Sequence, residues 1–124
     1  MIIAIDFDGT CVTHEYPEIG QDIGADTVIN ALVEAGHKII LWTMRSGPFL
    51  EDAVKWCEHK GIPLFGVNTN PDQASWTGSP KAYAQLYIDD AALGIPIVKS
   101  MFTERPYVDW ERVQEILEKE GILP

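Results

Sequence analysis

The stretch MIIAIDFDGT, residues 1–10, contains the pattern that decides the fold. Five apolar residues end in two carboxylates, which is typical of a buried parallel strand that carries acidic groups to its C-terminal end. In an open α/β sheet, ligands bind at that edge. Gly9 and Thr10 favour a tight turn directly after the acids. We therefore expect a ligand site at Asp6 and Asp8.

The size and composition of the chain predict one globular domain over residues 1–124. No apolar stretch is long enough to span a membrane, and residues 1–5 lack the basic flank of a signal peptide, so we expect no membrane partner and a cytoplasmic location. Nineteen acidic against nine basic residues give a net charge of -10. This charge argues against a nucleic-acid groove, and an anionic substrate would need positive charge from a metal or a few basic side chains.

Strand and helix patterns alternate along the chain, which predicts a mostly parallel sheet. Residues 11–24 and 69–80 are rich in turn-forming residues and are expected to be loops. Helices are predicted over residues 25–35, about 48–60 and 109–120. Further strands are predicted at residues 37–43, 64–68 and 85–88, with a short edge strand near residues 97–98.

The polar groups of the chain follow three of these strands: Asp6 and Asp8 the first, Thr43 and Arg45 the second, and Asp89 and Asp90 the fourth. Because the ends of parallel strands share one edge, these side chains are expected to converge. One such acid would most simply cap a helix, but four on two neighbouring ends repel one another strongly unless a cation is bound. Carboxylate oxygens suit Mg²⁺, which we predict as the cofactor.

Two further residues could bind a phosphate group. Thr43 offers a hydroxyl, and the turn after it offers free backbone N–H groups. Lys81 precedes the fourth strand and could bring a positive charge to the same edge.

The order of these motifs resembles the haloacid dehalogenase (HAD) superfamily of phosphohydrolases. DFDGT after the first strand, Thr43 after the second, then Lys81 and the Asp89-Asp90 pair match the four motifs of that superfamily within residues 1–90. The resemblance implies a Rossmann-like three-layer sandwich and a Mg²⁺-dependent phosphatase acting on phosphomonoesters. It also implies that Asp6 is the nucleophile, forming an aspartyl phosphate, and that Asp8 is the general acid and base.

The resemblance assigns the other site residues as well. Thr43 and Lys81 would hold the phosphoryl group and neutralise its charge. Asp6, the backbone carbonyl of Asp8, and Asp89 would bind Mg²⁺, with Asp90 supporting the metal.

Members of this superfamily usually carry a cap domain, but the intervals 10–43 and 43–81 are too short for one. We therefore expect a capless protein with no separate cap domain. Its open site would accept a large substrate or be closed by a second subunit of a homo-oligomer. The loops 11–24 and 68–80 would form the rim, with four candidate substrate contacts: His14, Tyr16, Arg45 and Trp76.

Two alternative functions are left open. A receiver-like phospho-acceptor domain would need an aspartate after the third strand, where this chain has Asn68. A non-catalytic HAD-like binding or scaffold protein would lack a catalytic acid, and none is missing. The phosphorylated substrate could be a small molecule or a macromolecule: a sugar phosphate, a nucleotide, a phosphorylated lipid-linked glycan or a phosphoprotein.

Overall fold

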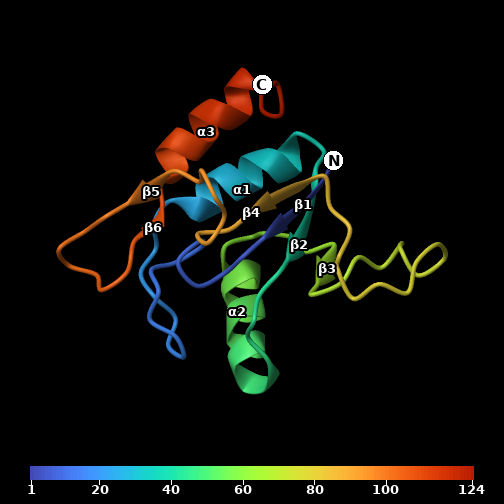
Figure 1. Ribbon diagram of the computed structural model, residues 1–124, viewed down its shortest axis with the longest axis horizontal. Coiled ribbons are helices and arrows are strands. Elements are labelled where there is room, and N and C mark those ends of the chain that lie inside the picture. The colour runs from blue at the N-terminus through green and yellow to red at the C-terminus, as the bar shows by residue number, and fades with distance from the viewer.

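A four-stranded sheet lies at the centre of the computed structural model, which describes residues 1–124. Its strands are β1 (Ile2–Ile5), β2 (Lys38–Leu41), β3 (Gly66–Val67) and β4 (Leu86–Ile88), in the order β3-β2-β1-β4. All three pairings are parallel. The predicted α/β, Rossmann-like fold with a mostly parallel central sheet is confirmed (Figure 1).

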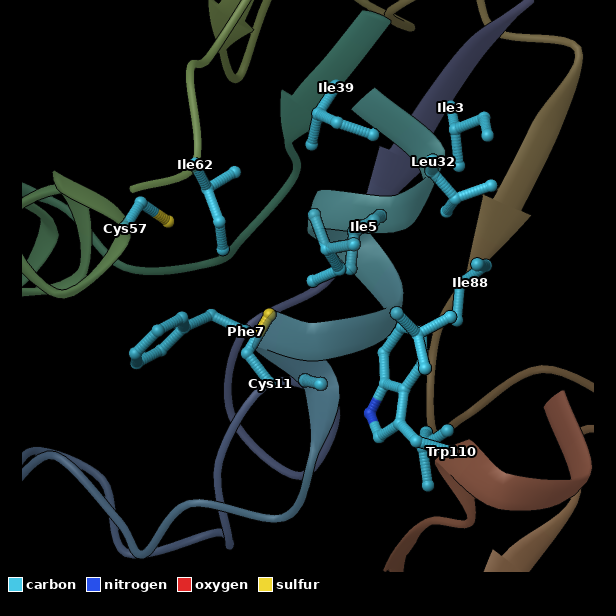
Figure 2. Packing of buried hydrophobic residues seen from close by; sticks show 14 of the residues in the cluster. Ile3, Ile5, Phe7, Cys11, Leu32, Ile39, Cys57, Ile62, Ile88 and Trp110 are labelled. Carbon is cyan, nitrogen blue, oxygen red and sulfur yellow. The ribbon is translucent and has the colours of Figure 1, made fainter. Parts of the chain in front are cut away.

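Three helices send their buried side chains to one face of this sheet: α1 (Ala25–Glu34), α2 (Gly47–His59) and α3 (Trp110–Lys119). Figure 2 shows Leu32 of α1, Cys57 of α2 and Trp110 of α3 in the same core as Ile3 and Ile5 of β1. The helices form where apolar residues recur at helical spacing. Their starts follow the predicted signals, since a proline lies in the first turn of α2 and an aspartate side chain caps α3.

The other face of the sheet is covered by an extended segment that contains no helix. Ala82 and Ala84 of this segment, residues 69–85, pack against Ala4 of β1 and Ile40 of β2. The sandwich therefore consists of a helical layer, the sheet and a layer of irregular chain. In Figure 1 this segment (yellow) lies at the opposite end of the molecule from the loops that follow β1 and β4.

The predicted strand near residues 97–98 exists, but it is not an edge strand of the main sheet. β5 (Ile97–Val98) pairs with β6 (Tyr107–Val108) in a separate antiparallel ribbon. Two hydrogen bonds fix β6 and the start of α3 to the turn after β1: Val108 N donates to Gly9 O at 3.0 Å, and Trp110 Nε1 donates to Thr10 O at 2.6 Å. The ribbon thereby brings its connecting loop beside the acidic strand ends.

The chain contains no separate cap domain. Between β1 and β2 it holds one loop and α1, and between β2 and β4 it holds α2, β3 and the extended segment. None of the three helices combines the length and the apolar composition that a membrane span requires.

Candidate functional site

Three carboxylates meet where β1 and β4 end. Ile5 pairs with Ile88, and Asp6 N donates to Ile88 O at 3.0 Å, so the residues that follow the two strands lie at the same level. One oxygen each of Asp6, Asp89 and Asp90 falls within 4.8 Å of the others. The convergence expected for these three residues is therefore present.

The turn after β1 holds the carboxylates in place. Thr10 Oγ1 donates to Asp6 Oδ2 at 2.8 Å and accepts from Asp90 N at 3.0 Å, so one hydroxyl joins both strand ends. Gly9 has a φ of 80°, and a Cβ at this position would overlap the Asp90 carboxylate. Only glycine combines this backbone conformation with such a close approach.

Burial and mutual repulsion perturb two of these acids. Loss of hydration raises the pKa of Asp6 to about 8, and its carboxyl–carboxylate hydrogen bond with Asp90 and the charge of Asp89 act in the same direction, against the Thr10 hydrogen bond. Burial also raises the pKa of Asp90. Such a cluster favours either a shared proton or a bound cation. The oxygen-only donor set fits a hard divalent ion such as Mg²⁺.

Asp8 points to a different partner from Asp6. Arg45 Nη2 donates to Asp8 Oδ1 at 2.7 Å, and Arg45 Nε donates to Asp8 Oδ2 at 2.8 Å. The Arg45 side chain is 1% exposed, and that of Asp8 is 12% exposed. Asp6 and Asp8 are two residues apart in sequence, yet Asp6 lies in a cluster of mutually repelling carboxylates and Asp8 in a bidentate ion pair.

Arg45 lines the cleft, but its N–H groups are engaged within the protein. Its other N–H groups donate to the carbonyl oxygens of Pro17 and Glu18 in loop 11–24 and of Phe49 in the first turn of α2. All five donors are thus used within the protein, and the side chain is buried because loop 11–24 folds over it. Arg45 organises Asp8 and this loop.

Thr43 lies beside the acidic cluster, as expected. Its N–H donates to Asn68 Oδ1 at 2.7 Å, and its Oγ1 accepts from Arg45 N at 3.2 Å, which leaves the hydroxyl proton free to donate. The backbone N–H groups of Asp8 and Met44 also have no acceptor in the protein. These donors could hold an oxyanion next to Asp6.

A cleft of about 490 Å³ opens over these groups. Its lining includes all four strand-end acids, Thr43 and His14. A second hollow of about 310 Å³ shares Asp6, Thr43 and Asp89 with it and extends to Asn68. The site is therefore wide, open to solvent and rich in oxygen atoms.

Lys81 and Trp76 line neither hollow, contrary to expectation. Lys81 Nζ lies 5.4 Å from the centre of the Tyr87 ring, over the face of the sheet that lacks helices. Trp76 is 63% exposed and packs edge-on against Tyr83. The physical reason is topological: both residues precede β4, so they lie toward its N-terminal end, and no helix carries them back across the sheet.

Of the two predicted rim loops, loop 11–24 lines the cleft through His14 and Tyr16, whereas loop 68–80 contributes Asn68 alone, to the second hollow. The opposite wall is formed by the β5–β6 loop, from which Arg105 reaches the cleft. Arg105 Nη1 donates to His14 Nε2 at 3.0 Å. Sequence reasoning missed Arg105 because the last 30 or so residues carried no motif. Recognising residues 97–98 and 107–108 as the two arms of one hairpin would have pointed to the loop between them.

No protein-family model matches the chain, and no curated protein sequence does either. Among solved structures, the chain is similar to a conserved protein encoded by a locus of Bacteroides thetaiotaomicron, with 35% sequence identity and a TM-score of 0.80. The match covers 97% of this chain and 91% of that chain. At this identity and coverage, the chain belongs to the same family as the conserved Bacteroides thetaiotaomicron protein.

Proposed function

We propose that the protein is a cytoplasmic, Mg²⁺-dependent phosphomonoester hydrolase of the HAD type. The observation that carries the proposal is the convergence of Asp6, Asp89 and Asp90 within 4.8 Å at the ends of parallel strands. Asp8 and Thr43 line the same cleft. The reaction needs this combination of a nucleophile, a proton carrier and a hydrogen-bond donor to the phosphoryl group.

Asp6, Asp89 and the backbone carbonyl of Asp8 would hold Mg²⁺, with Asp90 in support. The ion would supply positive charge that keeps Asp6 ionised and offsets the charge of the phosphoryl group. Without a cation the pKa of Asp6 is raised to about 8, so its carboxyl is mainly neutral at pH 7 and a poor nucleophile. The reaction is therefore expected to require the metal.

In the first half of the reaction, an oxygen of the Asp6 carboxylate attacks phosphorus. The phosphorus–oxygen bond to the leaving group breaks, and Asp8 gives its proton to that oxygen. In the second half, Asp8 takes a proton from water, whose oxygen attacks the phosphorus of the aspartyl phosphate. Inorganic phosphate leaves, and the Asp6 carboxylate is restored.

The proposal differs from the family pattern in how the phosphoryl group is held. The Thr43 hydroxyl and the free N–H groups of Asp8 and Met44 are available as donors. Lys81 takes no part, because it lies over Tyr87. Neutral donors thus replace the lysine, which places more of the charge neutralisation on the metal.

A specific observation favours the second candidate, a non-catalytic HAD-like binding protein. Both oxygens of Asp8 accept from Arg45 in a bidentate ion pair, so neither is free to bond an oxygen of the substrate. A general acid must carry a proton, so catalysis requires that Asp8 loosen from Arg45 when substrate binds. A binding protein would keep the pair intact.

The deciding experiment is a phosphate-release assay over a panel of phosphomonoesters, with Mg²⁺ and with a chelator. We expect Mg²⁺-dependent turnover by the natural protein and a loss of about 1,000-fold or more in Asp6→Asn. Asp52→Asn, on the exposed side of α2, is the matched control and should retain full activity. Turnover that survives Asp6→Asn, or no turnover on any compound, would refute the proposal.

A further inference from the structure

The cleft contains one arginine that keeps most of its N–H donors free of protein acceptors. Two arginines line it, Arg45 and Arg105. Arg45 spends all five N–H groups on protein acceptors. Any anionic group that enters the cleft can therefore be met by Arg105 alone among the basic side chains.

Arg105 is held in place without being neutralised. Its one side-chain hydrogen bond is from Nη1 to His14 Nε2. Since a guanidinium only donates, His14 accepts this hydrogen bond at Nε2. The two ion pairs of the chain are Arg45–Asp8 and Lys60–Asp22, so no carboxylate lies within 4.0 Å of Arg105.

The Arg105–His14 pair lines the same cleft as the strand-end acids. Both residues also line an adjoining hollow of about 510 Å³, whose lining contains none of Asp6, Asp89 and Asp90. Glu15 and Glu104 line that hollow without pairing with Arg105. A ligand in the cleft can therefore reach both the strand-end acids and the guanidinium donors that His14 does not use.

We propose that Arg105, positioned by His14, binds a second acidic group of the substrate, a carboxylate or a second phosphate. The substrate class is then a phosphomonoester that carries another anionic group along its length. This inference rests on the proposed phosphatase function for the identity of the first group. Arg105 is well suited to the task because guanidinium binds carboxylate and phosphate oxygens in pairs.

The position of Arg105 distinguishes this role from that of a replacement for Lys81 at the reacting phosphoryl group. A side chain at the reacting group would contact the carboxylates around it, and Arg105 contacts none. Its loop is instead tied through β6 to Gly9, with Val108 N donating to Gly9 O. This anchor fixes the distance between the second anion and the strand-end acids and so selects for substrate length.

The test compares substrates that differ only in the second acidic group. One pair is 6-phosphogluconate and glucitol 6-phosphate, and the other is fructose 1,6-bisphosphate and fructose 6-phosphate. In Arg105→Gln, kcat/KM should fall by about 10- to 100-fold, mainly through KM, for the substrate that carries the second acidic group in at least one pair. For the substrate of that pair that lacks the second acidic group, kcat/KM should change by less than about two-fold.

Three further variants serve as controls for the Arg105→Gln result. Arg105→Lys keeps the charge and should recover part of the loss, whereas His14→Leu should reproduce part of it with the same substrate selectivity. Arg112→Gln removes an exposed arginine of α3 and should leave both members of each pair unchanged. An equal loss on both members of both pairs would assign Arg105 to the reacting group, and no loss on either would remove it from binding. Both results overturn the inference.

A binding measurement separates this inference from the phosphatase proposal. In the Mg²⁺-loaded protein, the Arg105 Nε–H resonance should shift on addition of 6-phosphogluconate or fructose 1,6-bisphosphate, and much less with glucitol 6-phosphate. If no phosphomonoester is hydrolysed but this selective shift occurs, the phosphatase proposal fails and the second-anion site stands. If hydrolysis occurs and the resonance responds equally to all probes, the second-anion site fails alone.

Discussion

Asp6 and Asp8 differ in sequence position by two residues and in environment by the sign of the neighbouring charges. Asp6 faces Asp89 and Asp90, while Asp8 faces Arg45. The pKa of Asp6 is raised to about 8 by burial first and by its acidic neighbours next. The same tripeptide thus presents one carboxyl that needs a cation and one that already has one.

Removal of Arg45 from its buried ion pair with Asp8 should lower the stability of the protein strongly. Arg45→Gln leaves Asp8 largely buried without its counter-charge and removes donors from three backbone carbonyl groups, so we expect a loss of about 3 to 5 kcal/mol in the free energy of unfolding. Urea unfolding measures this. Lys60→Gln, which breaks the solvent-exposed pair with Asp22, is the control and should cause a much smaller change. Equal effects of the two substitutions would contradict this account of Arg45.

Gly9 should tolerate no side chain. Gly9→Ala forces a Cβ into the Asp90 carboxylate and strains a φ of 80°, so we expect a loss of about 1 to 3 kcal/mol and weaker Mg²⁺ binding by calorimetry. Gly78→Ala is the control, because a Cβ there meets no atom within 4 Å and the backbone φ is not positive. Unchanged Mg²⁺ affinity in Gly9→Ala would show that the turn does not shape the cluster.

At the level of elements, most of the fold could be predicted because each strand and helix carries a local signal. Apolar runs mark β1, β2 and β4, and the proline and aspartate caps mark α2 and α3. The β5–β6 ribbon could not be assigned, since a two-residue strand has no periodicity and its pairing depends on β6 docking at Gly9. The strand-end acids were found for the converse reason, that parallel strands share an edge.

The position of Lys81, which differs from the predicted one, is also decided by the element that carries it. Its position in the sequence matches a motif, but a residue reaches the C-terminal edge of the sheet only if an element carries it there. Here the segment between β3 and β4 is irregular and covers the sheet face with Ala82 and Ala84. The order of residues in a chain does not reveal this difference.

Lys81→Ala should therefore leave Mg²⁺-dependent phosphate release within about two-fold of the natural protein. Thr43→Val keeps the shape of the side chain and removes the hydroxyl, and should lower kcat/KM by about 10- to 100-fold. Steady-state kinetics on one substrate compares them directly. A large loss of activity in Lys81→Ala with full activity in Thr43→Val would show that Lys81, and not Thr43, binds the phosphoryl group.

For the whole molecule, the clustered acids link stability to pH and to metal. The folded protein holds a proton on Asp6 up to about pH 8, whereas the unfolded chain releases it near 3.8. The stabilising contribution of this proton is therefore complete below about pH 4 and is lost as the pH rises toward 8. Under the proposed function Mg²⁺ would bind the ionised carboxylates, so its stabilising effect should increase over the same range.

In metal-free buffer at about pH 8, Asp6→Asn should accordingly be more stable than the natural protein by about 1 to 3 kcal/mol. The difference should shrink near pH 5 and when Mg²⁺ is added. Thermal unfolding at both pH values measures it, with Asp52→Asn as the control. If Asp6→Asn is the less stable protein at pH 8 without metal, the strand-end acids do not repel one another as inferred.

The central claim, that Asp6 is a phosphoryl acceptor in a metal-dependent site, can be tested without knowing the natural substrate. The protein is mixed with acetyl phosphate and Mg²⁺, quenched in acid and analysed by peptide mass spectrometry. We predict one added phosphoryl group on Asp6, absent when Mg²⁺ is chelated and absent in Asp6→Asn. A phosphoryl group on another residue, or none on Asp6 at any time point, would contradict the account.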